Sequence, residues 1–268
     1  MSRTNFKELL EAGVHFGHQS KYWNPKMRPF IYTTFKKLHI INLEKSVTHF
    51  NQAKTFIEKI IKNNSKILFV GTKRAARDIV SKYATEAKMP YVNIRWLGGM
   101  LTNFDTVKKS IQKLDDLNSK LNTALIDGLT KKEMLVIKKQ IAKLEKNLSG
   151  IKNLETTPDA LFVIDTRYEK IAIQEANKLN IPVIAIVDSN NSFEGVDYMI
   201  PGNDDSMSSI ELFVKEITNI IVNTKSKFVK TASTKVEKPQ PDSSVTKTKS
   251  LKKKQVIDTK TIDDNKEG

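Results

Sequence analysis

One candidate pair of metal ligands consists of two aspartates that lie far apart in the sequence. Asp165 and Asp188 each end a short apolar run, and two carboxylates at the ends of strands could together hold Mg²⁺. Alternatively, Asp165 caps the helix that follows it and Asp188 stabilises the turn DSNNS. We favour capping, and we interpret Asp204 and Asp205 in the same way, as caps of the last helix.

Two histidines offer a second arrangement of metal ligands. His15 and His18 are three residues apart, a spacing that would place both on one side of a helix. Gly13 and Gly17 disfavour a regular helix there, however, and no cysteine or acid lies beside them. We therefore predict no metal site and no cofactor, and expect the rings to stack on RNA or to hydrogen-bond within a packed loop. No Ser-His-Asp arrangement is visible, so we assign no catalytic residue.

The segment VGTKRAARD, residues 70–78, follows an apolar run and opens a helical pattern. A phosphate could bind at this helix N-terminus, with Lys73 and Arg74 closing on it. The phosphate-binding loop GxxxxGK[ST] and the dinucleotide motif GxGxxG both require glycines beyond Gly71, so a nucleotide site is weakly indicated. The same geometry could take an RNA backbone phosphate, or the segment could be a solvated basic helix face.

Composition indicates the class of partner more strongly than these residues do. The 268 residues include 45 Lys and Arg against 30 Asp and Glu, so the formal net charge is +15. This surplus favours a polyanionic partner, nucleic acid before an anionic membrane. Cysteine is absent, which excludes disulfides and thiolate catalysis and fits a cytoplasmic location. The N-terminus does not resemble a signal peptide, and the apolar runs are too short to span a bilayer, so we expect no membrane partner.

Basic and aromatic residues are interleaved in a stretch without acids, from Gly13 to Leu43. Rings and guanidinium groups stack on unpaired bases and Lys neutralises phosphate, so the stretch is typical of an RNA-binding surface. Its bases are Lys21, Lys26, Arg28, Lys36 and Lys37. Its aromatic residues are Phe16, Tyr22, Trp23, Phe30, Tyr32 and Phe35.

Five short apolar runs predict the strands of a parallel sheet, because strands buried on both faces are apolar throughout. Helical patterns alternate with these runs, which predicts an α/β fold with helices on both faces of the sheet. The runs are KILFVGT (66–72), PYVNI (90–94), ALFVID (160–165), PVIAIV (182–187) and YMIP (198–201). The predicted helices lie near 44–62, 74–88, 168–180 and 206–224.

Two heptad patterns interrupt the alternation. Apolar residues recur at 3-4 spacing from Phe104 to Leu125 and from Ile137 to Ile151, with the turn IDGLT between them. We predict an inserted coiled-coil hairpin over residues 104–151, with a lysine-rich outer face.

The remaining residues fall into an α/β domain and a tail. Residues 1–103 and 152–226 are predicted to form the domain, with a basic N-terminal loop. Residues 227–268 contain few apolar side chains, so we predict a disordered basic tail.

The segment RWLGGMLTNF, residues 95–104, connects the predicted sheet to the hairpin. Gly98 and Gly99 permit backbone angles and close approaches that a side chain would block. The planar guanidinium group of Arg95 can form two hydrogen bonds to a phosphate. Trp96 can stack on RNA or pack into the apolar contact between the two helices of the hairpin. We interpret the two glycines as a structural joint that turns the chain out of the sheet.

Four segments resemble the signature blocks of the bacterial family of the second protein of the small ribosomal subunit. They are GVHFGHQSKYWNPKMRPFIY, IRWLGGMLTNF, IPVIAIVDSN and DYMIPGNDD, and they occur in family order within about residues 4–225. The resemblance implies a flavodoxin-like, doubly wound five-stranded sheet with an inserted coiled-coil hairpin and no catalytic activity. It also implies late binding to ribosomal RNA at the junction of head and body, and recruitment of the large messenger-binding protein of the same subunit.

Carried over residue by residue, the resemblance implies RNA-facing positions in the first two blocks. These are His18, Gln19, Trp23, Asn24, Lys26, Arg28, Arg95 and Trp96. The basic stretch adds Lys21, Lys36 and Lys37, and the segment after the first run adds Lys73 and Arg74.

We therefore predict a structural, RNA-binding constituent of the small ribosomal subunit, which is neither an enzyme nor a homo-oligomer. The alternative is a metal-dependent enzyme that acts on a phosphorylated small molecule. In that case Asp165 and Asp188 would hold the metal at the crest of the sheet, and Lys73 would clamp the anion.

Overall fold

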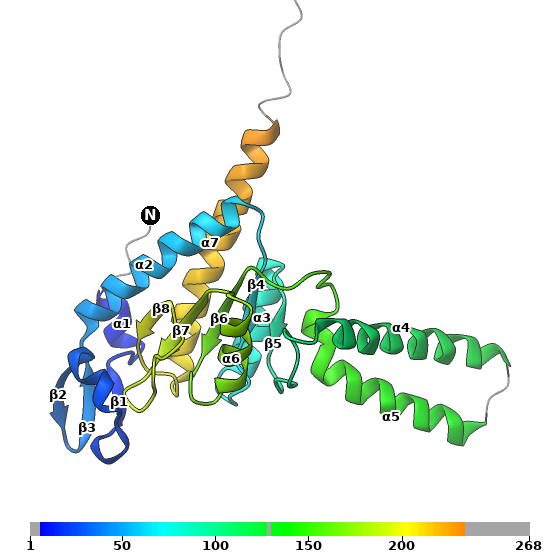
Figure 1. Ribbon diagram of the computed structural model, residues 1–268, viewed down its shortest axis with the longest axis horizontal. Coiled ribbons are helices and arrows are strands. Elements are labelled where there is room, and N and C mark those ends of the chain that lie inside the picture. The colour runs from blue at the N-terminus through cyan, green and yellow to red at the C-terminus, as the bar shows by residue number, and fades with distance from the viewer. Residues whose placement is uncertain (1–5, 128–129, 234–268) are drawn as a thin grey trace, which may run out of the picture.

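The computed structural model describes residues 6–127 and 130–233, without the side chains of 122–127 and 228–233 (Figure 1). At its centre lies a parallel sheet with the strand order β5-β4-β6-β7-β8. The strands are β4 (Ile67–Val70), β5 (Tyr91–Val92), β6 (Ala160–Ile164), β7 (Val183–Val187) and β8 (Tyr198–Pro201). All five lie within the predicted runs. Taken in sequence, their order is 2-1-3-4-5, which is the flavodoxin-like arrangement.

Burial on both faces explains why these strands read as uninterrupted apolar runs. Every residue of β4, β6 and β7 is buried. One face packs against α2 (Leu43–Lys62), α3 (Arg77–Ala87) and α7 (Met207–Ser233). The other face packs against α6 (Lys170–Lys178) and the segment after β5. The rings of Phe50 and Phe213 meet edge to face at 5.0 Å and join α2 to α7.

The basic N-terminal stretch is a small sheet rather than the predicted loop. After α1 (Phe6–Glu11), the strands β1 (Phe16–Gln19), β2 (Ile31–Phe35) and β3 (Leu38–Ile41) pair antiparallel in the order β1-β3-β2. Short 3-10 helices, η1 (Ser20–Tyr22) and η2 (Pro25–Phe30), connect β1 to β2. The hairpin was missed because Lys36 and Lys37 form its turn with φ of 47° and 65°, where Asn and Gly are usual.

Two helices project from the side of the sheet, next to its edge strand β5 (Figure 1). They are α4 (Phe104–Asp127) and α5 (Lys131–Leu148), and they lie side by side with a small apolar cluster between them. The cluster contains Leu114, Leu117 and Ile141. Both predicted helices are therefore present, whereas their supercoiling as a coiled coil stays a prediction. The side chain of Leu125 lies outside the described residues.

Helix α7 extends beyond its predicted end at 224 and runs to Ser233. The first seven residues of the predicted disordered tail, 227–233, are thus helical. The sequence from 224 to 233 contains no Gly or Pro that would end a helix, and its polar residues are compatible with one. Residues 234–268 lie outside the described part of the chain. None of the described helices combines the length and hydropathy of a membrane-spanning segment.

Candidate nucleic-acid interface

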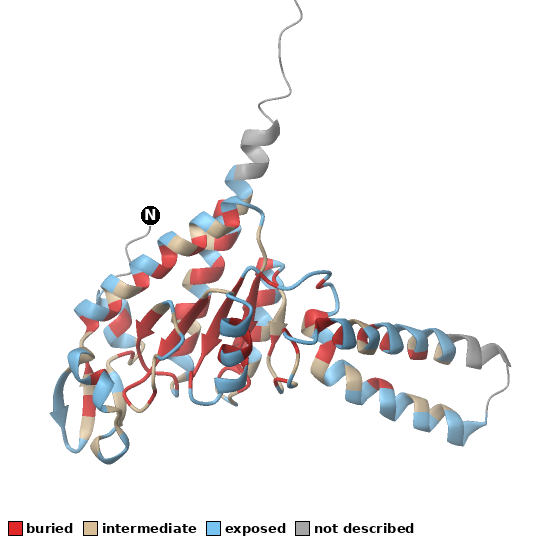
Figure 2. Cartoon of the chain, viewed as in Figure 1, coloured by how far each residue is buried: buried red, intermediate tan, exposed pale blue. Residues whose placement is uncertain are grey.

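The predicted basic residues of the N-terminal stretch are exposed on the small sheet and its connections. Lys21, Lys26, Arg28, Lys36 and Lys37 are all exposed, and Lys36 and Lys37 form the turn between β2 and β3. Figure 2 shows the outer part of this small sheet as largely exposed. Left-handed backbone angles are unfavourable for residues with a side chain, and such angles collect at functional positions. The turn thus holds two lysines outward in a conformation that asparagine and glycine would adopt more easily.

Exposed aromatic rings accompany these cations. Tyr32 is 75% exposed and Phe35 is 62% exposed, which is unusual for large apolar side chains. The Lys21 ammonium lies 4.5 Å from the ring centre of Tyr22, and the Lys36 ammonium lies 5.4 Å from that of Phe35. Such pairs present a ring face and a positive charge at one place, which suits a stacked base and its phosphate.

The small sheet is docked onto the carboxyl ends of β7 and β8. The Asn24 backbone N–H donates to the Ser189 carbonyl at 2.8 Å, and the His18 backbone N–H donates to the Ser189 hydroxyl at 2.8 Å. The Lys26 ammonium pairs with the carboxylate of Glu194. Trp23 is half-buried with its ring 5.2 Å from that of His39. The basic surface is thereby fixed at the sheet edge where ligands bind in open α/β folds.

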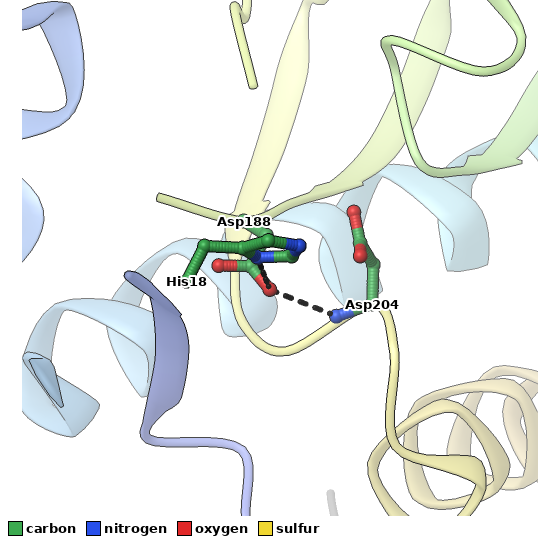
Figure 3. Close-up of side chains that lie close together, drawn as sticks. All are labelled: His18, Asp188 and Asp204. Carbon is green, nitrogen blue, oxygen red and sulfur yellow. Dashed lines mark hydrogen bonds and ion pairs between the residues drawn. The ribbon is translucent and has the colours of Figure 1, made fainter. Parts of the chain in front are cut away.

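Four aspartates from three strand ends converge beneath this surface. The Lys73 ammonium lies 3.2 Å from Asp165, 2.7 Å from Asp204 and 2.5 Å from Asp205. The imidazole Nδ1 of His18 lies 3.1 Å from Asp188 (Figure 3). Its Nε2 lies 3.0 Å from Asp205. Lysine and histidine thus hold together carboxylates that would otherwise repel one another.

The protonation of this cluster follows from burial and mutual repulsion. Burial, together with the charges of Asp188 and Asp165, raises the pKa of Asp204 to about 7. Hydrogen bonding to Asp188 raises the pKa of His18. Burial alone would lower the pKa of Lys73, but the adjacent carboxylates raise it above its ordinary value. Lys73 therefore stays charged, and its charge is already balanced by acids, so it does not fit the predicted role in binding an RNA phosphate.

The structure pairs His18 with carboxylates rather than with His15. Ligand atoms of His18, Asp188 and Asp204 lie within 4.8 Å of one another, and an imidazole with two carboxylates is a donor set that suits a divalent cation. The ring of His15 instead packs on Phe16, with 4.0 Å between ring centres. The sequence pattern could not reveal this set, because its members come from opposite ends of the chain.

The predicted caps are partly correct. Asp165 accepts hydrogen bonds from the N–H groups of Arg167 at 2.9 Å and Tyr168 at 3.0 Å, so it stabilises the turn before α6. Asp188 accepts from the hydroxyl of Ser189 at 3.0 Å, within the predicted turn. Asp204 and Asp205, however, do not cap α7. Asn203 instead accepts from the N–H groups of Asp205 at 2.8 Å and Ser206 at 3.1 Å, which closes the turn before α7. The carboxylates of Asp204 and Asp205 pair with Lys73, which the sequence analysis had predicted to bind an RNA phosphate.

A buried carboxylate that the sequence did not indicate organises the joint. Glu175 of α6 is 6% exposed and accepts hydrogen bonds from the segment after β5. Its donors are Trp96 Nε1 at 3.2 Å, the N–H groups of Gly99 at 2.7 Å, Leu101 at 3.0 Å and Thr102 at 3.2 Å, and the Thr102 hydroxyl at 3.2 Å. A single acid on α6 thus fixes the path of the chain into α4.

Of the two predicted joint glycines, one is required by its conformation. Gly99 has φ +87°, whereas a Cβ on Gly98 would meet no atom within 4 Å. A third glycine, Gly150, was not predicted. A Cβ there would collide with the backbone carbonyl of Tyr91 in β5. The joint therefore depends on Gly99 where the chain leaves the sheet and on Gly150 where it returns.

Residues 9–224 match the family model described as Ribosomal protein S2. The chain belongs to this family. As a ribosomal protein S2 family member, it is a structural protein of the small ribosomal subunit, and its partners are the ribosome's RNA and proteins. The match spans the α/β domain and the α4–α5 hairpin together, so both the sheet edge and the joint belong to the family's common region.

Two of the residues that the sequence analysis predicted to contact RNA have little free surface in this ribosomal protein S2 structure. Trp96 is 8% exposed and its indole N–H donates to Glu175, so its ring is largely covered by the protein. Lys73 is enclosed by carboxylates, which also removes the anion clamp required by the alternative enzyme. Gln19, Arg74 and Arg95 are exposed, and Arg74 and Arg95 follow parallel strands at the same sheet edge as the small sheet.

Proposed function

We propose that the protein binds folded ribosomal RNA through the exposed face of its small N-terminal sheet, which we call the basic face. The observation that carries this proposal is the run from 13 to 43, where five exposed cations and several exposed rings occur without one acid. Lysines on a rigid β-scaffold neutralise phosphates, and the rings beside them stack on unpaired bases.

The basic face, as we propose it, draws on most of the predicted RNA-binding residues. Its outward members are Gln19, Lys21, Lys26, Arg28, Lys36 and Lys37, with Arg74 and Arg95 farther along the sheet edge. His18, Trp23 and Asn24 lie at its half-buried base and position it on the sheet. Trp96 acts within the joint and Lys73 within the acid cluster.

We further propose that the binding site is the head–body junction, that binding occurs late in assembly, and that the protein helps recruit the large messenger-binding protein. The family resemblance supports these three points. A rigid domain with a projecting helical pair is also suited to joining surfaces of RNA and protein that lie apart, because the hairpin carries contacts well beyond the sheet (Figure 1).

The proposal can be tested by the salt dependence of binding to naked small-subunit RNA. Lys21→Ala, Lys36→Ala and Lys37→Ala together remove three exposed charges of the basic face. The plot of log affinity against log salt should flatten by about 2 to 3 units, because each phosphate contact releases about one counterion. A matched variant with Lys59, Lys62 and Lys215 replaced by Ala removes the same charge from α2 and α7.

The matched variant should keep the wild-type slope. If the two triple variants instead have the same slope, binding depends on net charge alone and the basic face is not the site. Circular dichroism of each variant checks that the fold is retained.

A further inference from the structure

We propose that a polar cavity at the N-terminus of α6 receives one unpaired nucleotide of the bound RNA. This inference rests on the proposed function and adds a recognition site to it. The cavity has a volume of about 470 Å³ and lies between α6 and the loop that follows β7. Small-ligand sites typically measure roughly 300 to 1,000 Å³.

Amide side chains surround the cavity. Asn24, Gln174, Asn177 and Asn190 all line it, from the basic face, from α6 and from the loop after β7. Each amide offers both a donor and an acceptor, which matches the mixed edge of a nucleobase. The Asn24 side-chain oxygen already accepts from the Lys26 N–H at 3.0 Å, so its NH₂ group is the part that can donate to a ligand.

The amide oxygen of Asn190 lacks a hydrogen-bond donor among the described residues, although it is buried. A buried acceptor without a donor is rare in folded proteins and calls for an explanation. The exocyclic amine of a base in the cavity would supply a donor once the Asn190 side chain turned toward it.

The cavity floor is apolar, and a glycine forms part of the wall beside it. Ile173, which is 5% exposed, contributes the apolar part. The Asn177 amide nitrogen lies so close to Gly195 that any side chain there would collide with it. A flat ring can lie on such a floor with its edge toward the amides.

The charges at the cavity mouth suit a phosphate. Arg167 and Lys170 are exposed lining residues at the start of α6, where the helix dipole also favours an anion. The carboxylate of Glu194 also lines the cavity, but it is paired with Lys26. Lys170 also acts on the Glu194 carboxylate, whereas Arg167 adds a further positive charge at the mouth for the phosphate.

Continuity with the basic face identifies the ligand as a nucleotide within RNA. Asn24 and Lys26 belong to the acid-free run, and the first lines the cavity while the second pairs across its rim. RNA that crosses the basic face thus passes the cavity mouth. Sequence-specific RNA binding commonly places unstacked bases into pockets of this kind.

Chemical probing of reconstituted small subunits tests the proposal. Wild-type protein should protect the Watson–Crick edge of at least one unpaired base. Gln174→Trp places a large ring in the cavity and should abolish that protection while the rest of the footprint remains. Ile171→Trp adds the same ring at an exposed position of α6 that does not line the cavity, and should keep the protection.

Two lysines of α6, one at the cavity and one away from it, allow a second test. Lys170→Ala should lower the salt slope for ribosomal RNA by about 1, because it removes one phosphate contact. Lys178→Ala removes an exposed charge at the other end of α6, away from the cavity, and should leave the slope unchanged.

The outcomes separate this inference from the proposed function. If Gln174→Trp keeps every protection and Lys170→Ala behaves like Lys178→Ala, the cavity proposal is wrong while RNA binding stands. If wild-type protein gives no footprint at all, both fail. If nucleoside 5′-monophosphates shift the amide resonances of α6 in NMR spectra but no base is protected in the subunit, the cavity takes a free nucleotide and the RNA assignment is wrong.

Discussion

The indole N–H of Trp96 donates to the carboxylate of Glu175 over 3.2 Å, and this bond connects the chain after β5 to the middle of α6. The same carboxylate also receives three backbone N–H groups of the segment that leads into α4. The Arg-Trp-Leu-Gly-Gly sequence is therefore a folded loop around a buried anion, and the direction of the hairpin is set inside the protein.

Replacing Glu175 by Gln should loosen this loop. An amide has one acceptor oxygen where the carboxylate has two, and its NH₂ group would face N–H donors. We expect a loss of about 1 to 3 kcal/mol in the free energy of unfolding at pH 7, measured by urea denaturation. Glu155→Gln, at an exposed position after α5, should change stability by less than about 0.5 kcal/mol. Equal effects of the two substitutions would show that the loop does not depend on the buried carboxylate.

The same residue predicts a pH dependence. Burial by itself would raise the pKa of Glu175, but the hydrogen bonds that its carboxylate accepts from N–H groups lower the pKa below its usual value of 4.5. Its contribution to stability is therefore fully present above pH 4.5 and is lost as pH falls through the lower folded-state value. Wild type should lose stability relative to Glu175→Gln in this acid range. Parallel stability curves for the two proteins from pH 7 to pH 3 would disprove the linkage.

The three glycines of the joint should respond differently to alanine. Gly98→Ala should be tolerated, since a Cβ there meets no neighbouring atom. Gly99→Ala should cost about 1 to 3 kcal/mol because of its positive φ. Gly150→Ala should displace the return of the hairpin from Tyr91 and reduce incorporation into small subunits most strongly. Thermal melts and co-sedimentation with subunits that lack this protein measure both effects. A Gly150→Ala protein that melts and sediments like Gly98→Ala would contradict the close approach.

The acid cluster should depend on its lysine. Lys73→Met removes the cation that lies 2.7 Å from Asp204 and 3.2 Å from Asp165, and should destabilise the protein by about 3 to 5 kcal/mol. Adding Asp204→Asn should restore part of this loss, because one of the repelling charges is removed. Arg74→Met, at the exposed neighbouring position, serves as the control and should have little effect. Urea denaturation of wild type, Lys73→Met, Asp204→Asn and the double variant gives the coupling energy. Additive effects of Lys73→Met and Asp204→Asn would refute the ion pair.

The β2–β3 turn should show a conflict between stability and binding. Lys36→Asn with Lys37→Gly places residues suited to two positive φ angles in the turn, and should raise stability by about 1 to 2 kcal/mol. The same change removes two cations of the basic face and should weaken binding to naked ribosomal RNA. Thermal melts and filter binding measure the two effects. Unchanged affinity would show that the turn faces away from the RNA.

Sequence reasoning succeeded where burial is uniform along a segment. The strands from Ile67–Val70 to Tyr198–Pro201 are apolar on both faces, so their type and their place in a parallel sheet could be predicted, whereas their order in the sheet came from the structure. The hairpin at Lys36 and Lys37 was missed because its turn lacks the usual residues. Two exposed lysines at positive φ gave no local signal for a turn.

The candidate site was harder to predict because its determinants are distant in sequence. Glu175 looks like a surface acid in a helical pattern, and its partners lie more than 70 residues earlier. Lys73 looks like a free phosphate ligand until Asp165 and Asp204 are brought beside it by strands β6 and β8. The types of these residues were evident from the sequence, but their partners depended on the topology.

The hairpin is attached to the sheet at its base, so a small rotation there moves its far end a long way. Helix α4 contains 24 residues, and at about 1.5 Å per residue it is roughly 36 Å long. A rotation of about 5° at its base would move its far end by roughly 3 Å, which is the length of a hydrogen bond. The anchorage at Glu175 and the tight passage of Gly150 past Tyr91 lie at that base, next to an edge strand of only two residues. A small rotation at the base of the hairpin is thus magnified toward its far end. A few hydrogen bonds and one close backbone contact beside β5 therefore set how accurately that end meets its partner.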